Sequence, residues 1–261
     1  MKQLGFVVIM VVLSRAITAS AESSGKPLKD MPLSLQNLKI SQTNTYKWAS
    51  VVQKDGKKES TDYAVLVVSS TPQGSNLFLH DTITLVRSYG GTVFKRSLKY
   101  PKKDLLRPEQ ISLDIIGEGK SVREMTYENG EMKIFESPGK ARTEHLGFED
   151  GVLTFNAMLR VVPLLPRQIG SSYKFKLYAE PFLFRIREAT QKDPEWTLTC
   201  AAMENVTIGR KTHECVRYRL DLKSVEVRTD IWVGKNNLVV KFVDYMPGGA
   251  SAGLLEATLQ E

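Results

Sequence analysis

Short segments in which apolar and polar residues alternate follow one another through most of this chain, and residues typical of turns separate them. Alternation with a period of two is the pattern of a β-strand that has one face toward a core. The predicted strands are residues 46–53, 61–69, 77–87, 92–100, 122–127, 131–136, 173–178, 182–188, 196–202, 213–222, 225–233, 238–244 and 254–259.

Short turns between these segments indicate direct antiparallel connections. Asn129-Gly130 lies between two of the segments, and Asn-Gly in that position is a strong local signal for a β-hairpin. Gly90-Gly91 and the stretch 72–74 mark further breaks. The predicted fold class is therefore mainly β: an antiparallel meander forming a curved sheet or half-barrel, with one short helix packed on it.

The helix is predicted at residues 150–162, which depart from the alternating pattern. Val152, Phe155, Leu159 and Val162 recur there at helical spacing, and Pro163 follows directly. We expect this helix to pack on the sheet.

The N-terminus has the features of a secretory signal peptide. Lys2 precedes an apolar run over residues 4–13, and Ala19-Ser20-Ala21 is the small-x-small pattern of a cleavage site, which predicts cleavage after Ala21. A membrane anchor is the alternative, but the run has about half of the ~20 apolar residues needed and Arg15 interrupts it. We therefore expect an exported protein, periplasmic or extracellular, that is soluble after cleavage.

Composition supports a single large domain after that segment. The chain has 261 residues, of which 42% are hydrophobic and 25% charged, enough to build a substantial core. Residues 1–21 are predicted to be the signal peptide, 22–36 a flexible linker, and 37–261 one β-rich domain. Any subdivision into two β modules would fall near residue 147.

The charge balance is modestly basic and identifies no partner. The 36 basic and 29 acidic residues give +7, and loss of Lys2 and Arg15 with the signal peptide leaves 34 against 29, or +5. Nucleic acid is not expected, because the chain has no reading helix, RNP-like motif or zinc-finger spacing. An anionic envelope surface is an open alternative to general solubility. The oligomeric state is not set by the sequence.

Two cysteines, Cys200 and Cys215, raise the question of a disulfide. An even number of cysteines in an exported protein favours a bond, which here would close a loop of about 15 residues. The strand pattern argues against it, because it places Cys200 on the apolar side of its strand and Cys215 on the opposite side. A bulge or a loop position would still permit the bond.

Strand alternation in the second half of the chain defines an apolar face and a charged face. The apolar face is either a closed core or a groove for an apolar ligand, and Phe175, Phe184 and Tyr218 are its candidate contacts. The charged face is either a solvated surface with cross-strand ion pairs or a basic stripe for an anionic surface. The apolar set is Tyr173, Phe175, Leu177, Phe184, Ile186, Val216, Tyr218, Leu220, Val225, Val227 and Ile231; the charged set is Lys174, Lys176, Arg185, Arg187, Arg217, Arg219, Glu226 and Asp230.

Several segments between residues 148 and 259 resemble a family of uncharacterised bacterial envelope domains, which are similar to LolA-type periplasmic lipoprotein carriers. The resemblance implies a curved half-barrel with helices against its concave side and an apolar cavity for acyl chains. It carries over no functional residue. The segments are residues 155–160, Pro163-Leu164, Gly170, 206–209, 214–216, 230–233 and 238–242.

No catalytic or metal-binding pattern is present. His213 and Glu214 are adjacent and point to opposite faces of a strand, and neither His80 nor His145 lies in a known motif. We therefore predict no cofactor, no metal and a non-enzymatic envelope protein that binds or escorts a lipid or acylated partner. The alternatives are an interaction or assembly module with a closed core, and a hydrolase whose site a single sequence does not reveal.

Overall fold

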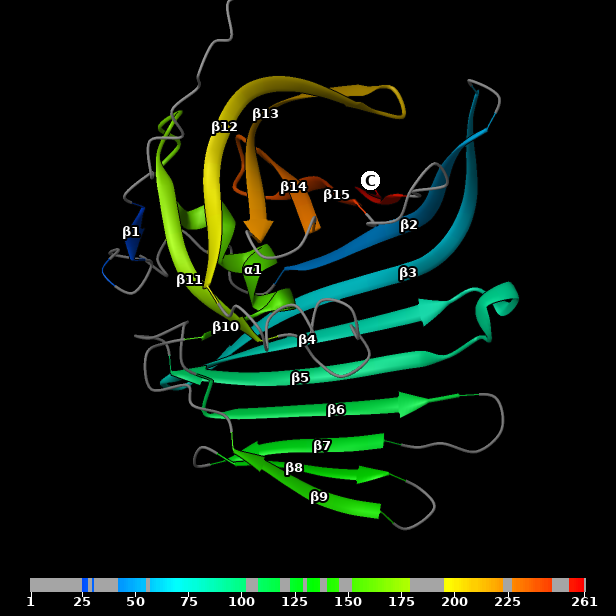
Figure 1. The fold of residues 1–261 in the computed structure, drawn as a ribbon, viewed down its shortest axis with the longest axis vertical. Coiled ribbons are helices and arrows are strands. Elements are labelled where there is room, and N and C mark those ends of the chain that lie inside the picture. Colours follow the sequence, from blue (N-terminus) through cyan, green and yellow to red (C-terminus); the bar gives the residue numbers. More distant parts are fainter. Residues whose placement is uncertain are drawn as a thin grey trace, which may run out of the picture.

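Antiparallel pairing between neighbouring strands builds most of the molecule in the computed structural model (Figure 1). The structure describes residues 25–27, 30, 42–54, 57–101, 108–117, 123–128, 131–136, 140–145, 152–178, 195–222, 227–245 and 254–260. The elements within these ranges are β1 (Lys26–Pro27), β2 (Thr43–Lys54), β3 (Lys57–Gln73), β4 (Asn76–Leu85), β5 (Val93–Pro101), β6 (Gln110–Ile116), β7 (Arg123–Glu128), β8 (Glu131–Glu136), β9 (Lys140–His145), β10 (Val152–Thr154), α1 (Phe155–Val161), β11 (Ser172–Tyr178), β12 (Glu195–Ile208), β13 (Lys211–Leu222), β14 (Val227–Gly234), β15 (Val239–Tyr245) and β16 (Leu254–Leu259).

One sheet contains all of these strands, in two blocks that follow the order of the chain. Strands β2 to β9 lie side by side, and so do β11 to β16. The blocks join where β16 pairs antiparallel with β2, which places Ala257 opposite Trp48. At the far end, β1 and β10 pair with β11 in parallel. The predicted mainly β, antiparallel fold class is confirmed.

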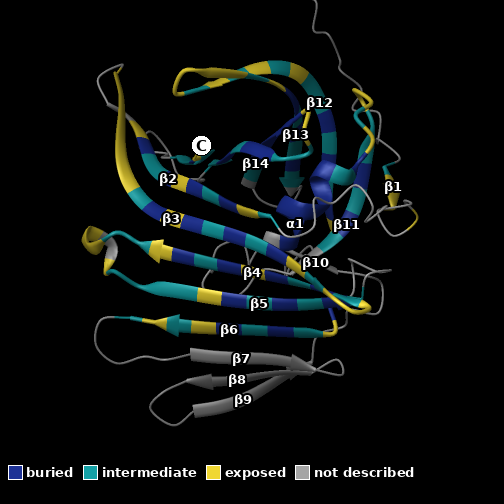
Figure 2. Ribbon diagram, turned by 180° about the vertical axis from the view of Figure 1, so that it is seen from behind, coloured by how far each residue is buried: buried dark blue, intermediate teal, exposed yellow. Residues whose placement is uncertain are grey.

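Helix α1 covers one face of the sheet, which we call the inner face. Met158 and Val161 of α1 belong to the same hydrophobic core as Leu66 and Leu98 of the first block and Tyr218 of the second. All five are at most 1% exposed. In Figure 2, the described part of α1 is dark blue, whereas the first residues of β3 and the turn between β12 and β13 are largely exposed. Both blocks therefore bury their apolar side chains in one shared core. Each Å² of apolar surface removed from water stabilises the fold by about 25 cal/mol.

Bulges interrupt the pairing at three described places. The extra residues are Ala201 in β12, Tyr63 in β3 beside the partner of Trp48, and Val240 in β15 beside the partner of Trp232. An extra residue on one strand bends that strand and increases its twist. In Figure 1, β12 and β13 arch over α1, whereas β4 to β6 run nearly straight. The predicted curved sheet is confirmed, and in the described residues it does not close into a barrel.

The short helix is also confirmed, but it begins later than predicted. Residues 152–154, which the helical spacing included, form β10 and pair with β11, with Val152 opposite Lys176. Pairing with a neighbouring strand outweighs local helical periodicity at these residues. A 3₁₀ turn over Val162–Leu164 continues α1, and Pro163 lies inside it rather than ending the helical segment.

Most predicted strands are present, and the differences are at strand ends and edges. The Asn129-Gly130 hairpin is confirmed, since Glu128 pairs with Glu131. Strand β12 continues to Ile208, six residues beyond its predicted end, because β13 supplies a partner along this length. The sequence analysis missed β6 and β9. The strand predicted at 182–188 lies outside the described residues.

The N-terminal part is only partly described. Ala21 and the predicted signal peptide lie outside the described residues, as does residue 147. Lys26 and Pro27, which the analysis placed in a flexible linker, form β1 and pair with Tyr173 and Lys174 of β11. Among the described residues, no helix has the length and apolar character needed to cross a membrane.

The two cysteines are free thiols, so the proposed disulfide is absent from the structure. Cys200 belongs to the inner core, whereas Cys215 lies in a smaller cluster with Trp232, Val240 and Val243 on the other face, which we call the outer face. Along the hairpin, Cys200 pairs with Tyr218 and Cys215 with Glu204. The sheet itself therefore separates the two sulfur atoms, as the strand pattern indicated.

Thiol labelling checks this arrangement. We expect both cysteines to take up iodoacetamide in denaturant without reductant, giving two labels per chain by mass spectrometry. In the native protein both should react slowly, because both are 0% exposed and burial raises the pKa of each thiol, to about 11 for Cys215. An unlabelled denatured chain that becomes reactive only after reduction would show a disulfide.

Candidate functional site

The structure places two of the three predicted ligand contacts in the inner core. Phe175 of β11 is 7% exposed and Tyr218 of β13 is 1% exposed, and β12 lies between their strands. Both belong to the core cluster that includes α1. Phe184 lies outside the described residues.

Tyrosine hydroxyls hold the segment after α1 against the sheet. The Tyr218 hydroxyl lies 3.2 Å from the carbonyl oxygens of both Leu165 and Pro166, and the Tyr173 hydroxyl donates to Pro166 O at 3.3 Å. Burial raises the pKa of both phenols, so they remain donors. Tyr218 thus lies beneath the segment that follows α1, and both Phe175 and Tyr218 are buried in the core to which α1 contributes.

Polar side chains also gather on the inner face, around α1 and strands β2, β4 and β5. We call Asn44, Tyr46, Asp81, Arg96 and Arg160 the inner polar group. Arg96 Nε lies 3.5 Å from Asp81 Oδ2, and both side chains are 2% exposed. With the Asn44 amide oriented so that its oxygen faces α1, this oxygen accepts a hydrogen bond from Arg160 Nη1 at 3.2 Å. Two guanidinium groups and one carboxylate are therefore buried in an otherwise apolar core.

Burial controls the ionisation of this group. It lowers the pKa of the Arg160 guanidinium, while Tyr46 and Asp81 act in the opposite direction. It raises the pKa of Tyr46 to about 12, although Arg160 favours the phenolate, and the Tyr46 hydroxyl donates to Val239 O at 3.1 Å. Tyr46 therefore stays neutral and supplies no counter-charge for the two arginines.

The inner polar group was not predicted from the sequence, although the strand patterns of β4 and β5 contain a signal for it. Asp81 stands in the run Leu77, Leu79, Asp81, Ile83, where every second residue points to the core. Arg96 likewise precedes Leu98 and Tyr100 on the buried side of β5. A charged residue at an apolar position of a strand marks a buried polar site.

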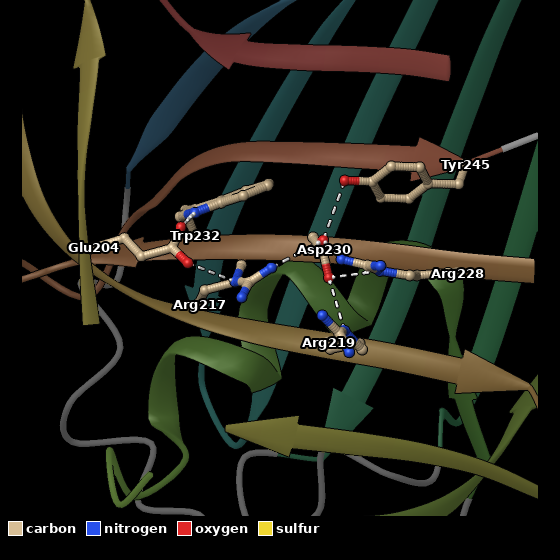
Figure 3. Close-up of polar contacts among 7 residues, drawn as sticks. All are labelled: Glu204, Arg217, Arg219, Arg228, Asp230, Trp232 and Tyr245. Carbon is tan, nitrogen blue, oxygen red and sulfur yellow. Dashed lines mark hydrogen bonds and ion pairs between the residues drawn. The ribbon is translucent and has the colours of Figure 1, made fainter. Parts of the chain in front are cut away.

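The outer face carries a second polar group, centred on Asp230 of β14 (Figure 3). Asp230 is 0% exposed, contrary to a solvated charged face. Its carboxylate receives hydrogen bonds from Arg228 and from the Tyr245 hydroxyl, the latter at 3.2 Å. Arg217 Nη1 and Arg219 Nε of β13 lie 3.5 and 3.6 Å from its oxygens.

Glu204 of β12 extends the outer polar group. Its carboxylate accepts from Trp232 Nε1 at 2.9 Å and pairs with Arg217 Nε at 2.9 Å. The guanidinium of Arg228 also stacks over the Tyr245 ring at 4.7 Å. These contacts link β12, β13, β14 and β15 on the face away from α1.

The outer polar group offers structural support rather than a docking charge. Its three arginines face the carboxylates of Glu204 and Asp230, and Asp221 lies close enough for Arg219 and Arg228 to affect its pKa, which burial raises. The described part of the predicted basic stripe is therefore largely compensated within the sheet. Binding to an anionic envelope surface stays a prediction.

Neither polar group forms a catalytic constellation. Both consist of arginines, carboxylates and hydroxyls in structural hydrogen bonds, with no nucleophile beside a base. Across the described ranges, no three His, Cys, Asp or Glu side chains come together as metal ligands.

No family model and no curated protein sequence matches this chain. Solved structures that resemble it include the following three. A β-barrel-like DUF1849 protein from Brucella abortus has 8% identity and a TM-score of 0.45, over 85% of this chain and 98% of that one. A DUF1329 family protein from Desulfovibrio piger has 10% identity and a TM-score of 0.31, over 88% and 89%. An exported protein with a YmcC-like fold from Bacteroides fragilis has 9% identity and a TM-score of 0.25, over 84% and 95%.

At these scores the function has to be argued from the chain's own residues. None of the three is described as a LolA-type carrier, and that resemblance stays a prediction.

Removing the Asp230 carboxylate tests the outer polar group. Asp230→Asn leaves three clustered arginines without their shared counter-charge, so we expect a loss of roughly 3 kcal/mol in the free energy of unfolding, measured with urea. The control is Asp62→Asn, which breaks the exposed 2.9 Å pair with Lys47 and should cost less than about 1 kcal/mol. Equal losses in the two variants would contradict the central role of Asp230.

Because burial raises the pKa of Asp244 in β15, we expect the stability of the protein to depend on pH. Burial raises the pKa of its carboxyl from 3.8 to about 6, although Thr229 Oγ1 donates to it at 2.7 Å. Between these values the native state binds more protons than the unfolded state, so stability falls as pH rises. The side chain of Asp244→Asn cannot ionise, so the variant does not lose stability in this way. The difference in the free energy of unfolding between variant and wild type, measured with urea, should therefore shift in favour of the variant by roughly 1 kcal/mol from pH 5 to pH 8. A difference that is the same at both pH values would refute the raised pKa.

Proposed function

We propose that this protein is a non-enzymatic, exported envelope protein that binds or escorts an apolar ligand, a lipid or an acylated partner, against the inner face of its curved sheet. The observation that supports the proposal most directly is the large apolar surface on the inner face of the sheet. Both blocks of strands contribute apolar side chains to one surface, and a short helix covers it where a closed barrel would have further strands.

Helix α1 suits the role of a movable cover. It has 7 residues, fewer than the ~12–15 at which an isolated helix becomes even marginally stable, so packing and neighbouring contacts hold it in place. Its apolar side chains, among them Met158, Leu159 and Val161, fill the space over the sheet. An acyl chain would take the place of these side chains when the segment moves.

A second candidate function is an interaction or assembly module with a closed core. The burial of Phe175 and Tyr218 in the inner core favours it, because in this structure neither residue is accessible to a ligand. The two functions differ in whether α1 moves.

Native mass spectrometry of the protein purified without detergent tests the proposal. We expect a lipid-sized mass adduct that disappears after organic extraction, because an apolar surface of this kind retains its ligand. Tyr218→Phe removes the hydroxyl that holds the Leu165–Pro166 segment, and should speed exchange of the adduct and of the amide hydrogens of α1.

Tyr245→Phe is the matched control, since it removes one hydroxyl from the outer polar group and should leave both rates unchanged. A clean mass before extraction, together with slow amide exchange in α1 in both variants, would favour the interaction module.

A further inference from the structure

The guanidinium of Arg160 is buried without a full set of hydrogen-bond partners. Arg160 is 7% exposed, and its Nη1 faces the Asn44 oxygen. Within the part of the chain that the structure describes, its Nε and Nη2 make no hydrogen bond. These two nitrogens form one edge of the guanidinium plane, with two parallel N–H donors spaced to match the two oxygens of a carboxylate or phosphate.

The charge around Arg160 also favours an anion. Asp81 is the carboxylate of the inner polar group, and Arg96 already lies 3.5 Å from it. With Arg96 and Arg160 both cationic, the described members of this group carry one net positive charge. Burial also disfavours the charged form of the Arg160 guanidinium and lowers its pKa, so a negative charge placed at its Nε and Nη2 edge would stabilise it.

The surroundings of Arg160 are apolar beyond that edge. Met158, Leu159 and Val161 flank it on α1 and Val162 follows in the 3₁₀ turn, and all four belong to the inner core. A ligand with its charge at Arg160 would therefore have to be apolar along the rest of its length. An inorganic anion would satisfy the arginine but would gain nothing from this core.

We infer that the Nε and Nη2 edge of Arg160 binds the anionic oxygen head group of a single-chain amphiphile, whose acyl or alkyl chain lies along the inner face. This inference rests on the proposed function and adds the chemical class of the ligand. A carboxylate and a phosphate monoester share the required chemistry, and the experiment separates them.

Equilibrium dialysis with three ligands of equal chain length tests the inference. Dodecanoate and dodecyl phosphate carry a negative charge, whereas dodecanol does not. In the wild type we expect at least one of the two anions to bind about tenfold or more tightly than dodecanol, as two charge-assisted hydrogen bonds suggest. The tighter of the two anions identifies the head group.

Variants at Arg160 assign this preference to its side chain. Arg160→Met should lose the preference for an anion while still binding dodecanol, and Arg160→Lys should retain part of it. Arg210→Met removes an exposed arginine from the β12–β13 turn and should leave the preference unchanged. Two outcomes would overturn the inference and leave the proposed function standing. In one, the wild type binds dodecanol as tightly as it binds both anions. In the other, Arg160→Met keeps the preference for an anion unchanged. No binding of any of the three would overturn both.

A measurement on the wild type covers the case in which Arg160→Met fails to fold. The carboxyl carbon of bound ¹³C-labelled dodecanoate should keep the chemical shift of the ionised form down to pH 5, because a neighbouring guanidinium lowers the pKa of a carboxyl group. A bound carboxyl that titrates above pH 6 would indicate an apolar site without the arginine and would overturn the inference.

Discussion

The antiparallel pairing of β16 with β2 makes one sheet out of two blocks of strands, and the shared core forms only because of it. On the outer face of this junction, the Glu256 carboxylate of β16 forms ion pairs with Lys241 Nζ at 3.0 Å and with Lys58 Nζ at 3.2 Å. Burial opposes ionisation of Glu256, but the two ammonium groups outweigh it and lower the pKa of its carboxyl. On the inner face, Trp48 of β2 packs edge-on against Phe242 of β15, with ring centroids 5.5 Å apart. Apolar packing and charge thus reinforce the same junction from opposite sides.

The two faces of the sheet handle buried charge in different ways. On the outer face, the arginines lie next to the carboxylates of Glu204 and Asp230, so that each arginine has an opposite charge nearby within the sheet. The Trp232 indole donates a further hydrogen bond to Glu204. On the inner face, Arg96 pairs with Asp81, whereas one edge of Arg160 has no hydrogen-bond partner among the described residues. A group that only stabilised the fold would be expected to resemble the outer one, because an excess buried charge reduces stability. This difference between the faces is the reason why we propose the inner face as the binding site.

Period-two alternation was sufficient to predict the fold class, most strands and the faces of Tyr173, Val216, Tyr218 and Ile231. It could not predict β9, whose residues Lys140–His145 show no regular apolar alternation and whose position depends on pairing with β8. Nor could it predict that Asp230 is fully buried, since its carboxylate is surrounded by Arg217 and Arg219 of β13 and Tyr245 of β15, two other strands of the sheet. Arg160 lies in the segment predicted as a helix, but its proximity to Asn44 and Asp81 arises from contacts between residues more than 75 positions apart.

Contacts at the β16–β2 junction are among the longest in sequence that a chain of this size can make. Tyr46 bonds to Val239 across 193 residues and Lys58 to Glu256 across 198. Sheets with many such distant pairings fold slowly, because the entropy of closing a long loop is lost before the contacts form. The strand at residues 254–259 is synthesised after every other strand described here, yet its place is in the middle of the sheet. Until it is available, β2 and β15 both present open edges, so the shared core cannot be completed while the chain is still being synthesised.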